Sequence, residues 1–552
     1  MSKIIKLLIK SFLTITVLSL ILWNCKSNSD KNVNQIIIGL DTDLYTLNPL
    51  FTNSETEANI SELIYLSLVG YNWDEHNGIV NAYPVLAKKW EWNEDSTSVL
   101  ITLREDVQWS DGVRFTADDI VYSFDLYSDP KVQSRFFGIL KNFYMKKDMS
   151  IDLEKSFKII NPFTLEINFI PNGNPSTYDF SLPIIPKHLF EKINRSELAT
   201  SDISFHAIGT GPYKLGTWQK NQYLKLENNS KSFLYNNSQI SQLVFKIIPD
   251  YNARIIQLKK GEIDLMEYVK PEDDVDLMKN NKLNITARKG REYDYLGFNN
   301  IAPASHNKVN QLFGSAEIRK AVTLAINREQ IVNDFLLKKG DVMITPVAPI
   351  FKNYINDTLK PLTFNPNAAK QILAKNGWFD NDHDGILEKG DKKFSFVLNI
   401  PAGNNLRQYS STIIQNNLKA VGIDVKIETL EPNLLFDKMF KKELDAWIAG
   451  WSIPIPLDLK PYWHSNPTIA QANVYSYANR QIDKILDRLD SRVSERDRII
   501  LLKQFQGIIH EDQPVVFLFW INNLVGYNKR LTNIDVNPLA TIQRCWEWKI
   551  VK

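Results

Sequence analysis

The chain has 552 residues and a mass of 63.7 kDa, which predicts about three or four folding units at roughly 100 to 200 residues per domain. Hydrophobic residues make up 44% and charged residues 23%, so the chain can build substantial cores and is not intrinsically disordered. The 65 basic residues almost balance the 63 acidic ones, and the net charge is +2. Because no large basic field is available, we expect no nucleic-acid partner. Only Cys25 and Cys545 are present, which excludes a disulfide-built scaffold and a paired-cysteine zinc site.

The first 25 residues have the pattern of an export signal. Three lysines precede an apolar run over residues 11–23, which is short for a membrane-spanning helix, and Cys25 follows this run. The pattern resembles a bacterial lipoprotein signal, which implies that Cys25 becomes the lipid-bearing N-terminus. An ordinary signal peptide or an uncleaved anchor is the alternative, and in either case the protein leaves the cytoplasm. Residues 26–34 are polar and predict a flexible tether.

The first part of the folded chain predicts strands and one well-marked helix. Residues 36–40 form a short apolar run typical of a strand, and residues 99–103 alternate apolar and polar side chains, as a half-buried strand does. Thr116 and Asp119 have the spacing of a capping box, in which each side chain bonds the other residue's backbone amide. Apolar residues then recur at three and four positions, so an amphipathic helix begins there.

The rest of the chain alternates strand-like and helix-like stretches, which predicts a mixed α/β fold. The best-bounded helix begins at Asn365-Pro366, a cap followed by proline at the first helical position, and Gly377 closes it. We find no short internal repeat, which argues against solenoids and propellers. The strand-like stretches are residues 164–170, 223–227, 243–248, 394–400 and 425–430, and the other helix-like stretches are residues 315–327 and 480–490.

Several stretches, in order along the chain, resemble those of a known family. The longest is PVLAKKWEWNEDSTSVLITLREDVQWSDGVRFTADDIVYSFDLYSDP, residues 84–130. It is followed by PKHLF from Pro186, GTGPYKLGTW from Gly209, RIIQLKKGEIDL from Arg254 and LDAWIAGW from Leu444. Together they resemble the family 5 solute-binding proteins of ABC importers, which include oligopeptide, dipeptide and nickel receptors. The resemblance covers the chain from about residue 36 to 530.

The resemblance implies a two-lobed α/β clamp of the periplasmic-binding-protein type II, with an extra inserted N-terminal subdomain. We expect lobe I to comprise residues 35–59, 181–294 and 521–552, the inserted subdomain residues 60–180, and lobe II residues 295–520. A solute that contacts both lobes favours the closed state, and the closed form is presented to a membrane permease driven by ATPase subunits. We therefore expect an exported, lipid-anchored monomeric receptor for short peptides, without catalysis or cofactor.

The resemblance also places a candidate ligand site around residue 451. Trp451 follows the glycine of the family's cleft segment, and its indole suits stacking on a peptide. Core packing explains a tryptophan here equally well, and Ser452 is a weaker candidate beside it. Peptide receptors of this family commonly carry an Asp three residues beyond this Trp, which pairs with the free amine of the peptide. Pro454 stands there instead, so amine anchoring is missing or moved. Asp458 is the nearest carboxylate that could replace it, although a loop-capping role explains it better.

Two further positions follow from the same resemblance. Phe136 or Phe137 falls near the place where relatives present an aromatic ring to the ligand, although either also suits a core. Leu44 lies where relatives offer main-chain groups to an extended peptide.

The residues Asp380, Asp382 and Asp384, followed by Gly385, resemble the opening of a calcium loop. The twelfth position is Asp391 and not the usual Glu, so a solvated turn without metal is the better interpretation.

Other functions remain as alternatives. The same receptor could serve an oligosaccharide or a metal chelate, since a fold does not fix its cargo. A surface lipoprotein that binds host or matrix protein is a second alternative. A hydrolase is disfavoured, because the sequence contains no G-x-S-x-G elbow, H-E-x-x-H helix or phosphate-binding G-x-x-x-x-G-K-[ST] loop.

Overall fold

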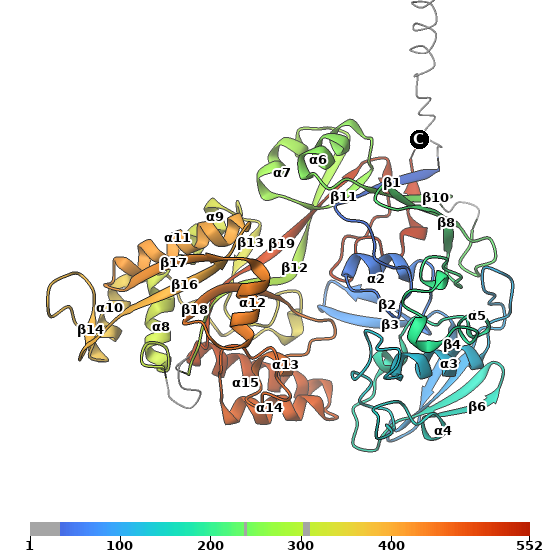
Figure 1. Ribbon diagram of the computed structural model, residues 1–552, viewed down its shortest axis with the longest axis horizontal. Coiled ribbons are helices and arrows are strands. Elements are labelled where there is room, and N and C mark those ends of the chain that lie inside the picture. The colour runs from blue at the N-terminus through green and yellow to red at the C-terminus, as the bar shows by residue number, and fades with distance from the viewer. Residues whose placement is uncertain (1–33, 237–239, 302–309, 552) are drawn as a thin grey trace, which may run out of the picture.

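Two bodies of secondary structure are joined by a pair of long strands (Figure 1). The structure, a computed structural model, describes residues 34–236, 240–301 and 310–551. The export signal, most of the tether and Cys25 lie outside the described residues. The joining strands are β12 (Leu283–Phe298) and β19 (Val516–Asn528), which pair antiparallel with each other. The predicted two-lobed type II α/β fold is confirmed.

One sheet runs through both lobes, with β12 and β19 in its middle. In the described ranges it has eleven strands in the order β17-β16-β18-β12-β19-β11-β1-β10-β9-β8, with β13 also paired to β19. The other strands are β1 (Gln35–Leu40), β8 (Tyr213–Gln219), β9 (Tyr223–Asn228), β10 (Gln242–Ile247), β11 (Leu265–Val269), β13 (Gly340–Val342), β16 (Ser395–Pro401), β17 (Asp424–Leu430) and β18 (Ala446–Ser452). β1 pairs parallel with β10, and β16 pairs parallel with β17. The lobes are therefore the two ends of one sheet.

The first lobe is the body around the core that includes Ile36, Phe124 and Leu243. Besides its share of the main sheet it holds a separate four-stranded sheet, the hairpin β2–β3 and several short helices (Figure 1). These elements are α2 (Glu55–Glu62), β2 (Val69–Asp74), β3 (Ile79–Pro84), β4 (Ala87–Trp92), β5 (Ser98–Leu103), α3 (Ala117–Ser128), α4 (Leu153–Ser156), β6 (Phe157–Asn161), β7 (Thr164–Asn168) and α5 (Lys187–Phe190). The predicted strands at 36–40 and 99–103 are confirmed, as is the capping box of Thr116 and Asp119.

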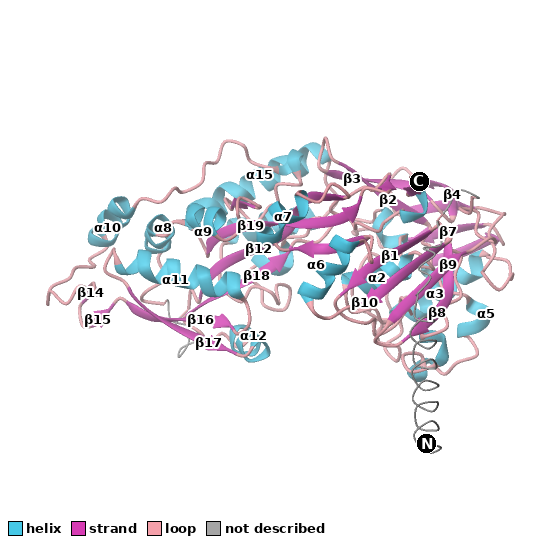
Figure 2. Cartoon of the chain, turned by 90° about the horizontal axis from the view of Figure 1, so that it is seen from above, coloured by secondary structure: helices cyan, strands magenta, loops and turns pink. Residues whose placement is uncertain are grey.

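The second lobe surrounds two further cores, which contain Leu398 and Trp463 respectively. Its helices lie around the strands of the main sheet, some packed against them and others further out (Figure 2). They are α8 (Ala316–Ala325), α9 (Arg328–Asp334), α10 (Pro366–Lys375), α11 (Asn405–Lys419), α12 (Pro432–Phe440), α13 (Lys460–Trp463), α14 (Arg480–Asp490) and α15 (Glu495–Asp512). Asn365 caps α10 and Gly377 follows it with φ +84°, as predicted.

The pair β12–β19 is irregular where it passes between the lobes. Its register shifts between Arg288 and Glu292, so the chain bulges there. Gly290 lies in this bulge, and a β-carbon on it would lie 1.7 Å from the carbonyl oxygen of Ile521. Only glycine fits such a close approach of two backbones. We call the crossing of β12 and β19 the hinge.

Two helices, α6 (Tyr251–Lys260) and α7 (Pro271–Met278), pack beside β11 above the hinge (Figure 1). No helix in the described ranges is both long enough and apolar enough to cross a membrane.

Candidate functional site

Two adjoining pockets lie where the lobes face each other. The first, of about 280 Å³, we call the tyrosine pocket because Tyr65, Tyr71, Tyr83 and Tyr178 line it. The second, of about 480 Å³, we call the charged pocket; its charged lining residues are Lys141, Asp458, Lys460, Asp490, Glu495 and Arg498. Val80, Tyr178 and Ile455 line both pockets, so the two form one elongated cleft. A molecule in this cleft would touch both lobes, because Tyr178 belongs to the first lobe and Ile455 to the second.

The tyrosine pocket is assembled from sequence-distant elements. Its walls come from the end of α2, the β2–β3 hairpin and residues 539–547 near the C-terminus. The rings of Tyr71 and Tyr178 stack with centroids 4.5 Å apart, and Tyr71 donates its hydroxyl to Thr177 at 3.1 Å. Burial raises the pKa of Tyr71 to about 12, so the wall stays uncharged at neutral pH. The pocket combines flat aromatic surfaces with few charges, as ligand sites commonly do.

The charged pocket carries cations and anions in contact. Lys141 of the first lobe pairs with Asp490 of α14 at 2.7 Å, and Lys460 reaches Asp490 at 3.1 Å. Burial opposes ionisation of Asp490, but the hydrogen bonds and charges of these two lysines hold its pKa below its ordinary value. Arg498 lies 3.8 Å from the carboxylate of its neighbour Glu495. Each of these cations thus has an acidic partner.

The lobes also meet through the turn of the β2–β3 hairpin. Asn353 donates its backbone N–H to the carbonyl of Asn77 at 3.3 Å, and Lys352 pairs with Glu75 at 3.2 Å. Gly78 has φ +66°, and a β-carbon on it would lie only 2.0 Å from the carbonyl oxygen of Ile350. We call these contacts, together with Lys141–Asp490, the rim contacts. They show that the lobes touch in this structure.

The three candidates near residue 451 lie in different surroundings. Trp451 is the half-buried penultimate residue of β18. It donates its indole N–H to Tyr475 at 2.6 Å and meets Tyr462 edge-to-face at 5.4 Å. Ser452 lines a small gap beside the hinge. Asp458 lines the charged pocket and accepts the N–H of Lys460 at 3.0 Å, and burial raises the pKa of its carboxyl. The structure thus brings Asp458 into the cleft, whereas Trp451 and Ser452 line neither pocket.

The two remaining candidates belong to the body of the first lobe. Phe136 packs edge-to-face on Tyr127 at 5.0 Å and lies under the guanidinium of Arg135 at 4.4 Å. Leu44 is 4% exposed, and its carbonyl accepts a hydrogen bond from Lys220 at 3.0 Å. Neither lines the two pockets. Their roles in binding stay predictions.

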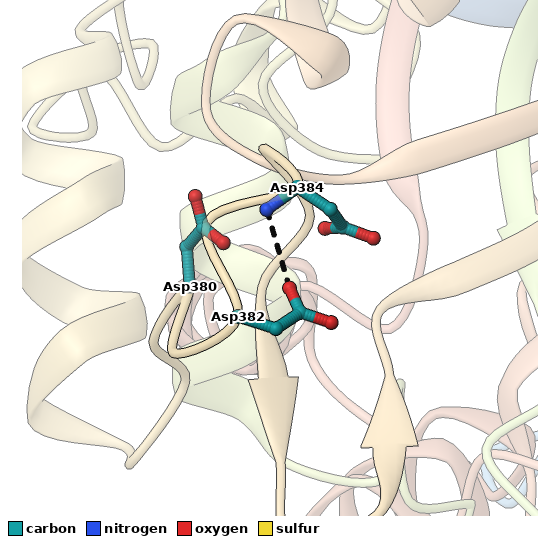
Figure 3. A group of neighbouring side chains, drawn as sticks. All are labelled: Asp380, Asp382 and Asp384. Carbon is teal, nitrogen blue, oxygen red and sulfur yellow. Dashed lines mark hydrogen bonds between the residues drawn. The ribbon is translucent and has the colours of Figure 1, made fainter.

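The acidic turn forms a compact loop (Figure 3). Carboxylate oxygens of Asp380, Asp382 and Asp384 lie within 4.8 Å of one another. Lys393 pairs with Asp382 at 3.0 Å and also with Asp384, while Asp380 accepts the N–H of Gly385 at 3.1 Å. The loop therefore carries a cation of its own beside two of the three carboxylates.

The tyrosine pocket and its one unpaired acid, Glu62, were not predicted from the sequence. Glu62 ends α2 and lines the pocket, and it makes no hydrogen bond or ion pair within the described ranges. The sequence did contain a signal for this residue, because an acidic side chain in the last turn of a helix is unfavourable. An acid that ends a helix among apolar residues is a candidate for function.

Comparison with known proteins agrees with this architecture. Residues 81–469 match the family described as bacterial extracellular solute-binding proteins, family 5. The oligopeptide-binding protein AppA of Bacillus subtilis is 30% identical over 527 residues, which cover 94% of this chain and 92% of AppA. The probable D,D-dipeptide-binding periplasmic protein DdpA of Escherichia coli is 26% identical over 511 residues, which cover 92% of each.

Solved structures show the same fold. AppA of B. subtilis in complex with a nonapeptide has a TM-score of 0.73 and 27% identity, and the match covers 94% of this chain and 99% of AppA. NikZ of Campylobacter jejuni in complex with Ni(L-His) has the same TM-score at 24% identity, with 94% and 99% covered. The family match spans well over half of the chain, and both lobes and the cleft are present. This chain therefore belongs to the bacterial extracellular solute-binding proteins of family 5.

Proposed function

We propose that the protein captures short peptides between its lobes and delivers them to the permease of an ABC importer, whose ATPase subunits supply the energy. The observation that carries this proposal is the cleft lined by both lobes, with Tyr178 on one side and Ile455 on the other. The relatives AppA and DdpA, described as oligopeptide-binding and dipeptide-binding, support a peptide as the solute. We further propose that the protein makes and breaks no bond in its solute.

Solute binding would act by shifting a population. A solute that contacts both lobes stabilises the closed form by the contacts that only the closed form offers. The charged pairs of the rim, Lys141–Asp490 and Lys352–Glu75, are exposed to solvent, so they add little to the closed form and leave the balance close enough for a solute to decide it. The permease could then distinguish loaded from empty receptors by shape.

The boundaries and the anchor belong to the same proposal. We propose that residues 60–180 are an insertion into lobe I, since β4, β5, β6 and β7 form a sheet of their own. We also propose that the mature protein is a monomer held outside the cytoplasm by lipid on Cys25.

Asp458 is our first candidate among the predicted ligand contacts because it lines the cleft. Trp451, Ser452, Phe136 and Leu44 would need the cleft to open differently in order to reach a peptide.

Native mass spectrometry of protein purified without denaturation tests the cargo. We expect a mixture of short peptides to be released intact. A single sugar or a metal complex would contradict the peptide assignment and leave the receptor assignment standing. Products of peptide cleavage that accumulate with time would contradict the absence of catalysis.

A further inference from the structure

The tyrosine pocket contains a carboxylate that has no hydrogen-bond or ion-pair partner among the described residues. Glu62 lies in the last turn of α2, and its accessible side chain lines the pocket. No hydrogen bond or ion pair joins it to any residue that the structure describes. Free carboxylates at an open surface are common, but this one lies among aromatic side chains in a cleft.

The other charges of the pocket cancel each other. Arg544 and Glu547 are the other ionised side chains among the described residues that line it, and they form an ion pair at 2.5 Å. Arg544 also donates to the amide oxygen of Asn72 at 2.6 Å. With this pair neutral, the unpaired Glu62 gives the pocket lining a net charge of −1.

The position of Glu62 is unfavourable for an anion in the free protein. The C-terminal end of a helix carries partial negative charge, and α2 has no basic residue in its last turn. Although solvent reaches Glu62 through the pocket, the protein packed around it raises its pKa above the ordinary value, and the more distant charge of Arg135 only partly offsets this. Arg135 itself lies over the ring of Phe136. A cationic group of a bound ligand would stabilise the ionised Glu62 against both effects, the partial negative charge of the helix end and the burial.

The rings around the pocket suit a substituted ammonium group. Tyr71 and Tyr178 stack on one another, and Tyr83 lines the same space. Aromatic faces attract cations and also accept the apolar carbon atoms next to an amine. One carboxylate among several rings is therefore a site for an organic amine more than for a bare metal ion, which would need several oxygen ligands.

We propose that Glu62 is the amine anchor of this receptor, and that the tyrosine pocket binds a primary ammonium group of the peptide. It takes over the task of the carboxylate that is absent where Pro454 stands. The ammonium could be the free N-terminus or a lysine side chain, and both have the same chemistry. From this end the peptide would run past Tyr178 and Ile455 into the charged pocket. This inference rests on the proposed peptide-binding function.

The test compares Glu62→Gln with the wild type on defined peptides. The substitution keeps the size of the side chain and removes its charge. The matched control is Glu94→Gln, an exposed acid in the turn between β4 and β5 that lines neither pocket. The probes are a pool of synthetic lysine-free peptides of two to nine residues, the same pool N-acetylated, and the acetylated pool with one lysine in each peptide. Binding is read by native mass spectrometry and then by calorimetry on the peptides retained.

We expect the wild type to bind the free-amine pool, and Glu62→Gln to weaken that binding about 10- to 100-fold, as expected for the loss of a charged hydrogen bond. Glu94→Gln should leave it unchanged. If the free N-terminus is the group bound, acetylation weakens wild-type binding by a similar factor. If a lysine side chain is bound, the lysine-containing acetylated pool restores it.

The outcomes separate the two proposals. If the wild type binds none of the pools, the proposed peptide function fails. If it binds the free-amine pool and Glu62→Gln binds equally well with an unchanged melting temperature, the function stands and the role of Glu62 is wrong. Equal wild-type affinity for the free and acetylated lysine-free pools would also overturn the amine site.

Discussion

The hinge and the rim, two places where the lobes meet, are built from different interactions. At the hinge, β12 and β19 continue from lobe to lobe, and buried bidentate ion pairs hold them on either side. Asp294 on β12 receives two hydrogen bonds from Arg407, and Asp264 next to β11 receives two from Arg530. These aspartates are 3% and 0% exposed. At the rim, by contrast, the side chains of Lys141 and its partner Asp490 are 60% and 34% exposed.

The contrast indicates which contacts are able to break. Removing one member of a buried ion pair costs about 3–5 kcal/mol, whereas exposed pairs contribute about 0–1 kcal/mol. The hinge therefore persists through opening and closing, and the rim contacts can form and separate with little cost. A solute in the cleft adds contacts between the lobes on the rim side, where the protein's own ion pairs are weak. In the proposed mechanism these added contacts stabilise the closed form.

The largest expected effect is at the hinge. Arg407→Ala leaves Asp294 buried without its partner, and we expect the free energy of unfolding to fall by about 3–5 kcal/mol. Urea unfolding of the purified protein measures it, with the exposed Arg496→Ala of α15 as the control. A loss below about 1 kcal/mol would mean that Arg407–Asp294 behaves like an exposed pair, and the contrast between hinge and rim would be wrong.

The next effect concerns the turn at the rim. Gly78→Ala places a methyl group 2.0 Å from the carbonyl oxygen of Ile350, so the lobes cannot close fully. We expect peptide affinity in calorimetry to fall about tenfold, which corresponds to about 1.4 kcal/mol. Gly385→Ala is the control, because Gly385 also has positive φ (+87°) but nothing lies within 4 Å of the place that its new methyl group would take. Equal affinities of the two variants would show that the turn does not limit closure.

A smaller effect is expected from the exposed rim pair. Lys141→Met removes the contact between Lys141 and Asp490, and we expect peptide affinity to fall by about 1 kcal/mol or less, with the difference fading as salt increases. Lys131→Met, an exposed lysine of the same lobe, is the control. If the loss is larger and independent of salt, the pair is part of the binding site and not of the rim alone.

The smallest expected effect is a change in melting temperature when the charge of Glu62 in the cleft is removed. The surrounding protein raises the folded-state pKa of Glu62, so its ionised form destabilises the empty protein once the pH rises through the ordinary carboxyl range. Glu62→Gln should therefore raise the melting temperature at pH 7 by about 1 °C, and the difference should vanish as the pH falls below that range. Burial raises the pKa values of Tyr71 and Tyr83 away from this range, and Glu547 is paired with Arg544. A melting temperature lowered by the substitution would show that Glu62 already has a stabilising partner.

Local features of the fold could be predicted because they depend on neighbouring residues. The apolar run at 36–40, the capping box at Thr116 and the cap at Asn365 each became the predicted element. β12 was not predicted as one long strand, because its first half, with Arg288, Lys289 and Gly290, has no clear alternation. Its pairing with β19 brings together residues more than 200 positions apart, which no local pattern records.

Of the ligand contacts predicted from the family resemblance, Asp458 lines the cleft, and its role in binding stays a prediction. Glu62 was missed because its pocket forms only when α2, the β2–β3 hairpin and residues 539–547 come together. The sequence around Glu62 does not reveal its pocket, because the residues that surround its carboxylate come from parts of the chain that are far apart in sequence.

The central claim, closure by a solute that touches both lobes, is tested most directly by small-angle X-ray scattering. The protein is first freed of bound solute in mild denaturant and refolded, and is then measured alone and with the free-amine peptide pool. We predict a smaller radius of gyration with peptide. Superimposable profiles from samples in which calorimetry shows saturated binding would contradict closure by the solute.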